Sequence, residues 1–237
     1  MPKTKSMILE RGGQTDGLAM RFGKEIPEGS LVFMEGTEGT GKSILCQRLC
    51  YSFLRNGYIC SYLSTQFTVK NFVRQMASVS YDVKKYLLKG KLFFISTESI
   101  LGETLPKDAF LSKLLTCRKL FETEIIFIDS ISTLLNESID NNNLSDLLNF
   151  FNRWMGAGKI IFLTANSNEW DPRIHQTFKL TSDVHFESAI VNIPGIGLSH
   201  QIHLHKFSGA KYKYQTSTAF SVRPGMGISL ESTHVAF

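Results

Sequence analysis

Apolar residues occur along this chain in short continuous runs, and between the runs they recur every three or four positions. The continuous runs predict strands over residues 30–35, 58–65, 92–97, 124–130 and 159–166. The helical spacing predicts helices after residue 43, after an N-cap at Thr68, over residues 107–121 and over residues 144–155. Strands that alternate with helices are typical of a parallel sheet covered on both faces, so we expect an α/β fold with a mostly parallel, twisted central sheet.

The pattern changes after about residue 182, where the apolar runs become shorter and partly alternating. These runs are DVHFESAIV, QIHLHKF, TAFSV and GISLE, with Gly, Pro and Ser between them. They predict antiparallel strands and hairpins added to the edge of the sheet. The polar segment NESIDNNN, residues 136–143, predicts a loop. No repeat, low-complexity tail or linker interrupts the chain, so we expect a single domain over residues 1–237.

Composition and charge narrow the class of protein. The chain has 43% hydrophobic and 20% charged residues, which is ordinary for a globular protein. It contains no run of 18 apolar residues, and its first residues lack the apolar stretch of a signal peptide, so we expect a cytoplasmic location. Cys46 and Cys50 share a helix face without nearby histidines, so we interpret them as core residues.

The net charge of +5 suits a nucleic acid or an anionic membrane surface, but an excess of this size is also common on a solvated face. The segment KYKY carries Tyr212 and Tyr214 between lysines. It fits either a stacking patch for single-stranded nucleic acid or a solvated edge, and we favour the edge.

The segment GTEGTGKS, residues 36–43, fits the phosphate-binding pattern G-x-x-x-x-G-K-[ST] between a predicted strand and a predicted helix. Backbone N–H groups of such a loop surround phosphates, and the helix N-terminus adds positive potential. Lys42 would reach the β- and γ-phosphates, and Ser43 would give its hydroxyl to Mg²⁺. The alternative is a chance glycine turn, which a full motif in this setting disfavours. The expected phosphate-binding residues are Gly36, Thr37, Glu38, Gly39, Thr40, Gly41, Lys42 and Ser43, with ATP and Mg²⁺ as ligands.

Two polar residues end other buried strands. Asp129 follows four apolar residues in IIFID and is the expected second partner of Mg²⁺; the alternative is a carboxylate that caps the next turn. Asn166 ends the run 159–166 and either contacts the attacking water or the γ-phosphate, or simply closes the strand.

The segment FGKEIPEGSLVFMEGTEGTGKS resembles the entry to the RecA-like ATPase domain of KaiC, and the resemblance continues through YLSTQ and IIFIDS to LHKFSG. Within that superfamily the chain is most similar to the FlaH (ArlH) family of the archaeal flagellum, or archaellum. The resemblance implies a RecA-like P-loop fold and a cytoplasmic ATP-binding regulator or assembly factor beneath the membrane motor. It implies as partners the motor ATPase FlaI, the membrane platform FlaJ and a scaffold ring protein, and it leaves a homo-oligomer open.

Two positions depart from the hydrolysing members of the superfamily. Where those members commonly carry a glutamate that polarises the attacking water, this chain has Gln66, whose neutral amide can orient a water but cannot take its proton. The alternative is that Gln66 only caps the next turn. Where a neighbouring subunit of KaiC-like rings supplies a K-x-R pair, Lys206 matches the lysine and Ser208 stands in place of the arginine. Both departures predict that ATP is bound and cleaved slowly or not at all.

Three functions compete on this evidence. The first is an ATP-loaded regulator of a motor. The second is an active RecA-like recombinase or DNA-dependent ATPase, which the basic charge favours and the two departures disfavour. The third is a small-molecule phosphotransferase, for which we find no substrate lid and no acidic base.

Overall fold

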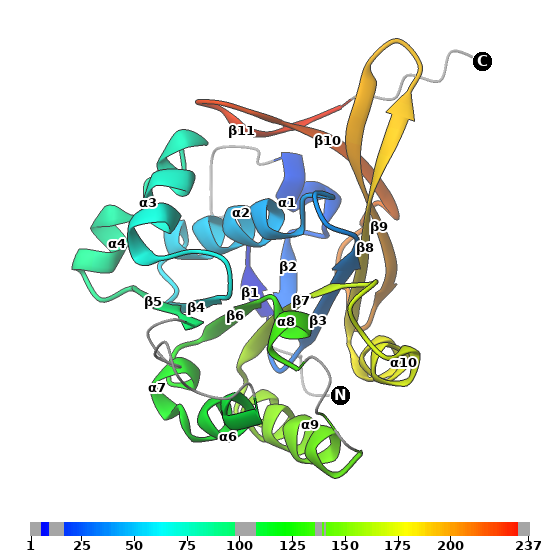
Figure 1. Cartoon of the computed structure of the whole chain (residues 1–237). Coiled ribbons are helices and arrows are strands. Elements are labelled where there is room, and N and C mark those ends of the chain that lie inside the picture. The colour runs from blue at the N-terminus through cyan, green and yellow to red at the C-terminus, as the bar shows by residue number, and fades with distance from the viewer. Residues whose placement is uncertain (1–5, 10–16, 98–107, 136–138, 140, 232–237) are drawn as a thin grey trace.

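The computed structural model describes residues 6–9, 17–97, 108–135, 139 and 141–231, and its centre is a nine-stranded sheet (Figure 1). The strands lie in the order β11-β10-β9-β8-β3-β7-β6-β4-β5. Their bounds are β3 Leu31–Gly36, β4 Cys60–Ser64, β5 Leu92–Ser96, β6 Ile125–Asp129, β7 Ile160–Asn166, β8 Val184–Ile193, β9 Gly197–Phe207, β10 Ser217–Arg223 and β11 Gly227–Leu230. The run from β8 to β5 is parallel, whereas β9, β10 and β11 pair antiparallel, which confirms the predicted sheet.

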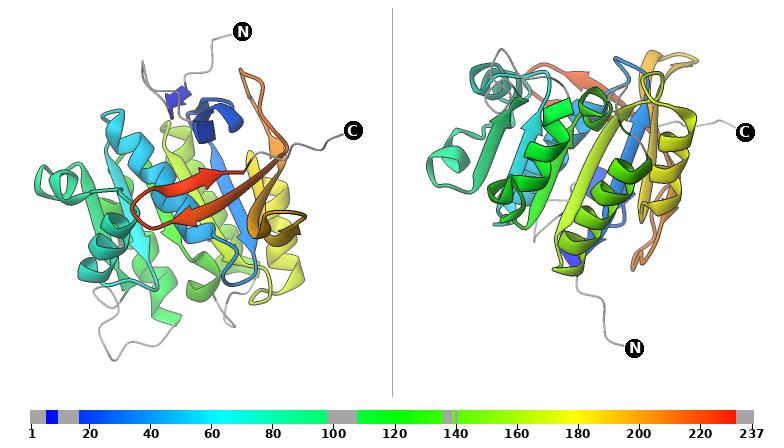
Figure 2. Two further views of the ribbon diagram at one scale, coloured as in Figure 1. Left: turned by 90° about the horizontal axis from the view of Figure 1, so that it is seen from above. Right: turned by 60° about the horizontal axis from the view of Figure 1, so that its bottom comes forward.

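Helices cover both faces of the sheet (Figure 2). One face packs against α1 (Gly17–Arg21), α2 (Lys42–Arg55), α3 (Val69–Ser78) and α4 (Lys84–Leu88). The other carries α6 (Asp108–Thr116), α7 (Arg118–Phe121), α8 (Ile131–Leu134), α9 (Asn141–Gly156) and α10 (Pro172–Thr181). A short antiparallel pair, β1 (Ser6–Ile8) and β2 (Glu25–Pro27), lies beside the first face. The two faces bury separate apolar clusters, and Cys46 and Cys50 lie in the first, as predicted.

The inner parallel strands β3, β4, β6 and β7 follow the predicted runs because they are apolar on both sides and buried by helices. β3, β4 and β6 are buried at every position. Thr68 caps α3 by accepting a hydrogen bond from the N–H of Asn71, and Phe72 and Met76 face the core. The prediction for this part of the chain is confirmed.

Four elements differ from the prediction. The helix expected over 107–121 is divided at Cys117 into α6 and α7, where Thr116 bonds back to carbonyls of its own turn; Lys107 lies outside the described residues. Of the loop expected over 136–143, residues 141–143 belong to α9, which begins at Asn141, and residues 136–138 and 140 lie outside the described residues. The run QIHLHKF begins four residues early, at Gly197, and β8 pairs parallel with β3 before it pairs antiparallel with β9. α10 was not predicted, although Asp171 and Pro172 are a strong helix start.

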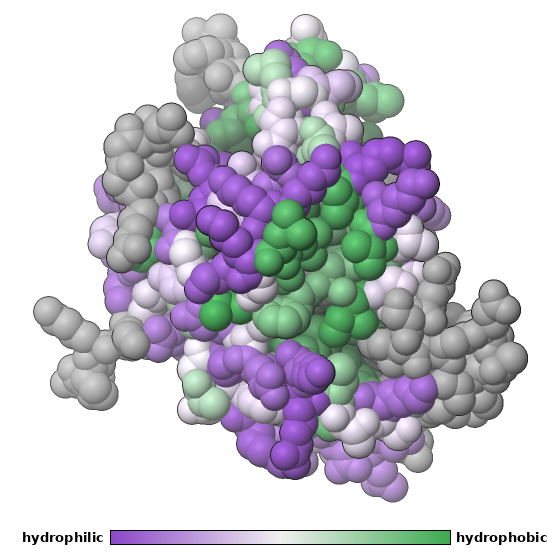
Figure 3. Space-filling view, turned by 90° about the vertical axis from the view of Figure 1, so that its left-hand side faces the viewer, coloured by the Kyte–Doolittle hydropathy of each residue, from purple (hydrophilic) through white to green (hydrophobic). Residues whose placement is uncertain are grey.

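Apolar side chains reach the surface at the β5 end of the sheet (Figure 3). Leu88 on α4 and Phe93 on β5 are among the exposed large apolar residues. Within the part of the chain that the structure describes, no helix is both long and apolar enough to cross a membrane.

In the KYKY segment, Tyr212 and Tyr214 are exposed, and Lys211 pairs with Glu25 at 3.5 Å.

Candidate nucleotide-binding site

The phosphate-binding motif forms the turn between β3 and α2, at the carboxyl edge of the parallel strands. Strand register brings Gly36 opposite Asn166 on one side and Ser188 on the other. A Cβ at Gly36 would lie 2.3 Å from the carbonyl oxygen of Ser188, and its φ of 149° also favours glycine, so this position cannot carry a side chain without a shift. The motif's first glycine therefore permits the close approach of β8 to the loop.

Hydrogen bonds inside the loop hold its shape. Thr40 Oγ1 donates to the carbonyl oxygen of Thr37 at 2.8 Å and lies 2.8 Å from Ser188 Oγ. Gly41, with a φ of 93°, is the N-cap of α2, and Lys42 and Ser43 begin the helix. Lys42 Nζ donates to the carbonyl oxygens of Gly36 at 2.8 Å and Thr37 at 2.6 Å. Burial lowers the pKa of Lys42, and the nearby carboxylates of Asp129 and Glu169 oppose that shift.

Asp129 lies beside Ser43 at the end of β6, where only 5% of its surface is exposed. Ser43 Oγ donates to Asp129 Oδ1 at 3.0 Å, and Thr164 Oγ1 donates to the same oxygen at 2.7 Å. The hydroxyl of Tyr62 donates to Asp129 Oδ2 at 2.7 Å. Three hydroxyl donors thus satisfy the oxygens of this buried carboxyl group.

The donor set of Ser43 and Asp129 fits Mg²⁺. That ion prefers oxygen ligands and is bound in nucleotide sites by one or two protein oxygens together with phosphates and water. Ser43 and Asp129 supply a hydroxyl and a carboxylate oxygen that are only 3.0 Å apart. Among the described residues no group of three or more His, Cys, Asp or Glu side chains could hold a metal ion, so a metal here would need further ligands from a bound phosphate.

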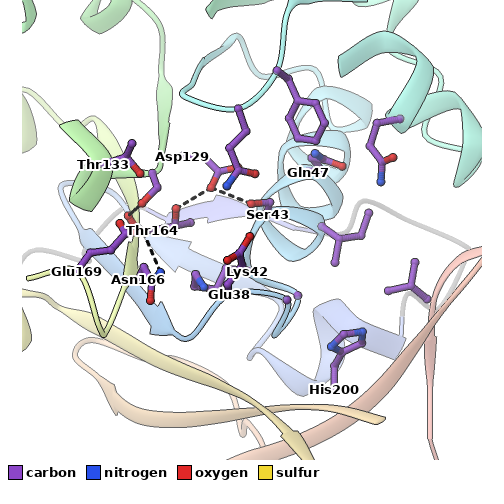
Figure 4. Close-up of a pocket in the computed structure, with 18 residues that line it drawn as sticks. Glu38, Lys42, Ser43, Gln47, Asp129, Thr133, Thr164, Asn166, Glu169 and His200 are labelled. Atoms are coloured by element: carbon purple, nitrogen blue, oxygen red, sulfur yellow. Dashed lines mark hydrogen bonds between the residues drawn. The ribbon is translucent and has the colours of Figure 1, made fainter. Parts of the chain in front are cut away.

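A cavity of about 480 Å³ opens over the loop, α2 and the ends of β6 and β7 (Figure 4). Its volume lies in the range of small-molecule and cofactor sites. Of the residues that the sequence singled out, Glu38, Gly39, Gly41, Lys42, Ser43, Gln66, Asp129 and Asn166 line it. Five of the eight motif residues thus surround one space together with Gln66, Asp129 and Asn166, whereas Gly36, Thr37 and Thr40 do not line it.

Lys206 does not line this cavity. Its Nζ donates to the carbonyl oxygen of Leu180 at 3.1 Å and to that of Ser182, so it ties β9 to the end of α10. The N–H of Ser208 donates to the carbonyl oxygen of Asp183 at 2.8 Å. Within one chain, Lys206 and Ser208 therefore join the end of β9 to the segment between α10 and β8.

Sequence reasoning missed several polar residues at the site. Tyr62 and Thr164 lie inside apolar runs, and only strand pairing shows that both reach Asp129. Glu169 lines the cavity, and its Oε1 accepts from Asn166 Nδ2 at 2.9 Å. His200 on β9 also lines the cavity and stacks on Phe220 with ring centroids 5.1 Å apart. No local sequence signal marks Glu169 or His200, because both come from segments that contact the loop only in the folded chain.

A buried ionic cluster lies directly before the loop, on the face of β3 that is turned away from α2. Glu35 is 2% exposed and contacts Lys179 Nζ at 2.8 Å, His185 Nε2 at 2.7 Å and His175 Nε2. Burial alone would raise the pKa of Glu35, but hydrogen bonds from His185 and Lys179 and the positive charges of His175 and Lys179 outweigh it and lower the pKa to about 2. The cluster joins α10 and β8 to the strand that carries the loop.

Comparison with known proteins agrees with this geometry. A family model described as "ATPase: KaiC" matches residues 14–176. The chain is 37% identical to the archaeal flagellar ATP-binding protein FlaH of Methanocaldococcus jannaschii, over 93% of this chain and 94% of that protein. It is 35% identical to FlaH of Methanococcus voltae, over 99% of this chain and 100% of that protein.

Solved structures show the same fold. The crystal structure of the flagellar accessory protein FlaH from Methanocaldococcus jannaschii matches with a TM-score of 0.87 and 33% identity, over 97% of this chain and 100% of that one. A KaiC-like protein of Pyrococcus horikoshii matches with a TM-score of 0.68 and 20% identity, over 88% and 92% of the two chains, which is a likeness of fold alone.

Proposed function

The chain belongs to the KaiC-like ATPase family and, within it, to the FlaH proteins of the archaeal flagellum, and on that premise we propose that it is an ATP-binding regulator of the archaellum motor. In this proposal the loop 36–43 holds the phosphates of Mg-ATP. Lys42 neutralises the β- and γ-phosphates, and Ser43 and Asp129 hold the Mg²⁺. The 3.0 Å contact between Ser43 and Asp129, beside Lys42 in one cavity, is the observation that carries it.

We propose that the bound ATP is cleaved slowly or not at all. Gln66 lines the cavity where a water-polarising glutamate would be expected, and an amide does not accept the proton of the attacking water. Lys206 bonds to its own chain and Ser208 replaces an arginine, so we propose no arginine finger from this segment. Loss of such a finger can reduce the rate by ~10³ to 10⁵. A slowly hydrolysed γ-phosphate can act as a signal.

The partners in this proposal are the motor ATPase FlaI, the membrane platform FlaJ and a scaffold ring protein, through which the protein would sit at the cytoplasmic face of the membrane. The evidence for them is the family alone. A single domain over residues 1–237 and self-association of the protein are also part of the proposal. The rival function, a DNA-dependent ATPase, predicts that single-stranded DNA stimulates turnover, and the same preparation can test this.

Calorimetric titration of the purified protein with ATP, with and without Mg²⁺, tests the site. We expect Lys42→Ala to remove most of the ATP affinity, because no other cation of the motif replaces its ammonium group against the phosphates. We expect Asp129→Asn to weaken the Mg²⁺ dependence of binding more than binding itself. Unchanged ATP affinity in the Lys42→Ala variant would refute the site.

A further inference from the structure

Glu169 places a carboxylate in a cavity that is otherwise suited to phosphates (Figure 4). Glu38 and Asp129 also line the cavity, and a further negative charge beside a triphosphate is unfavourable by electrostatics alone. The hydrogen bonds to Asp129 come from Ser43, Tyr62 and Thr164, whereas those to Glu169 come from Asn166 and Ser132, so Glu169 lies outside the proposed metal-binding pair. Both of its oxygens accept hydrogen bonds from neighbouring side chains.

The carboxylate connects three elements at the carboxyl edge of the sheet. Its Oε1 accepts from Asn166 Nδ2 at 2.9 Å, and its Oε2 accepts from Ser132 Oγ at 2.9 Å. Ser132 Oγ in turn accepts from the backbone N–H of Asn166 at 2.9 Å and lies 2.7 Å from Ser130 Oγ. Glu169 therefore joins the end of β7 to the start of α8 and to the residue that follows Asp129.

An ionised carboxylate only accepts hydrogen bonds, so it determines which atom donates in each hydrogen bond of this network. Ser132 must donate to Glu169, and Ser130 must then donate to Ser132. The amide of Asn166 must present Nδ2, rather than Oδ1, to Glu169. Its Oδ1 meanwhile accepts from the N–H of Asn168 at 3.2 Å, which fixes the same orientation from the other side.

We propose that Glu169 is a positioning residue that fixes the Asn166 amide so that a donor is presented to the terminal phosphate of bound ATP. Nδ2 carries two N–H groups, and Glu169 takes one of them, which leaves the second for a group in the cavity that Asn166 lines. With the amide reversed, the carbonyl oxygen would face the phosphate and repel it. Glu169 thereby contributes to discrimination between ATP and ADP. This inference rests on the proposed function, since it requires a nucleotide in the cavity.

The test compares affinities for ADP and for a non-hydrolysable ATP analogue, both with Mg²⁺, by calorimetry. We expect the wild type to prefer the analogue. Glu169→Ala should reduce that preference by about tenfold, the value of one hydrogen bond to a charged group, and should change ADP affinity much less. Glu169→Gln keeps an acceptor for Asn166 Nδ2 and should retain the preference. In an Asn166→Ala background, Glu169→Ala should have no further effect on the preference.

The opposite results would overturn the proposal. If Glu169 acted only as a repelling charge, both of its single variants would increase the preference for the analogue. If it acted independently of Asn166, Glu169→Ala would have the same effect in the Asn166→Ala background. Should Glu169→Ala fail to fold, Ser132→Ala removes one partner of the carboxylate and should reduce the preference in the same direction. A wild type that binds neither nucleotide would refute the proposed function itself, a result distinct from a wild type with a preference that Glu169→Ala leaves unchanged.

Discussion

Gln66 is the residue on which the rate of hydrolysis depends in the proposed function, and the prediction at this scale concerns it. It lines the cavity at the end of β4. We expect wild-type turnover well below the ~1 to 100 s⁻¹ of dedicated phosphoryl-transfer enzymes, because no group at that position accepts the proton of the water. Gln66→Glu should raise turnover, and a radiolabelled phosphate-release assay measures it. Lower turnover with intact ATP binding would contradict the placement of the water next to Gln66.

The same scale shows where sequence reasoning succeeds and where it stops. The loop and Asp129 could be predicted because a motif and a strand end are local patterns. Tyr62, Thr164 and Glu169 could not, since each gains its role from a partner on another strand or loop. The phosphate-binding motif can therefore be recognised from local sequence, whereas the residues that orient and stabilise the polar groups of the cavity depend on tertiary structure.

At the scale of elements, the sequence predicted the parallel strands within one or two residues but not α10 or the pairing of β8. The strands are continuous apolar runs, which is a strong local signal. The neighbour of β8 cannot be read from its own residues, because its first five positions pair with β3 and its remainder extends along β9 alone. α10 does carry a local start signal in Asp171 and Pro172, which was not used in the prediction, and its side chains Lys179 and His175 contact Glu35 on β3.

The Glu35 cluster predicts how these elements respond to acid. The pKa of Glu35 is lowered from 4.5 to about 2, so the contribution of its ionised form to folding stability is present above pH 4.5 and is lost as the pH falls towards 2. The effect corresponds to about 3 kcal/mol at neutral pH, of which about 2 kcal/mol should disappear between about pH 5 and pH 3. Urea denaturation at each pH measures the free energy of unfolding. Glu35→Gln should be less stable than wild type at neutral pH and should lose about 2 kcal/mol less across this window.

A matched control separates this effect from general acid sensitivity. Glu122 is an exposed glutamate on the same side of the sheet, after α7, and Glu122→Gln should keep the wild-type pH dependence. Equal pH dependence in wild type and Glu35→Gln would show that the cluster does not hold α10 and β8 on β3.

At the scale of the whole molecule, the nucleotide site is continuous with segments that reach away from it. Ser188, whose Oγ is 2.8 Å from Thr40 of the loop, lies on β8, and beyond it β8 and β9 continue as a hairpin past the end of β3 (Figure 1). The hairpin exposes Ile190, Ile196 and Leu198. On the other side of the cavity, Asp129 leads into α8. A change at the γ-phosphate could therefore alter surfaces on two sides of the site.

The last prediction follows from this arrangement and decides the proposed regulatory role. ATP can shift a conformation only by as much as it binds one state better than the other. A coupling of ~1 to 3 kcal/mol would change partner affinity by roughly 5- to 150-fold, and by linkage the partner must tighten ATP binding by the same factor. We expect ATP, without hydrolysis, to strengthen binding to the motor ATPase FlaI, and Lys42→Ala to abolish the effect. Titrations of FlaI without nucleotide, with ADP and with a non-hydrolysable ATP analogue measure it. Identical affinities in all three would mean that ATP has a structural role only, because a ligand that does not distinguish two states cannot transmit a signal between them.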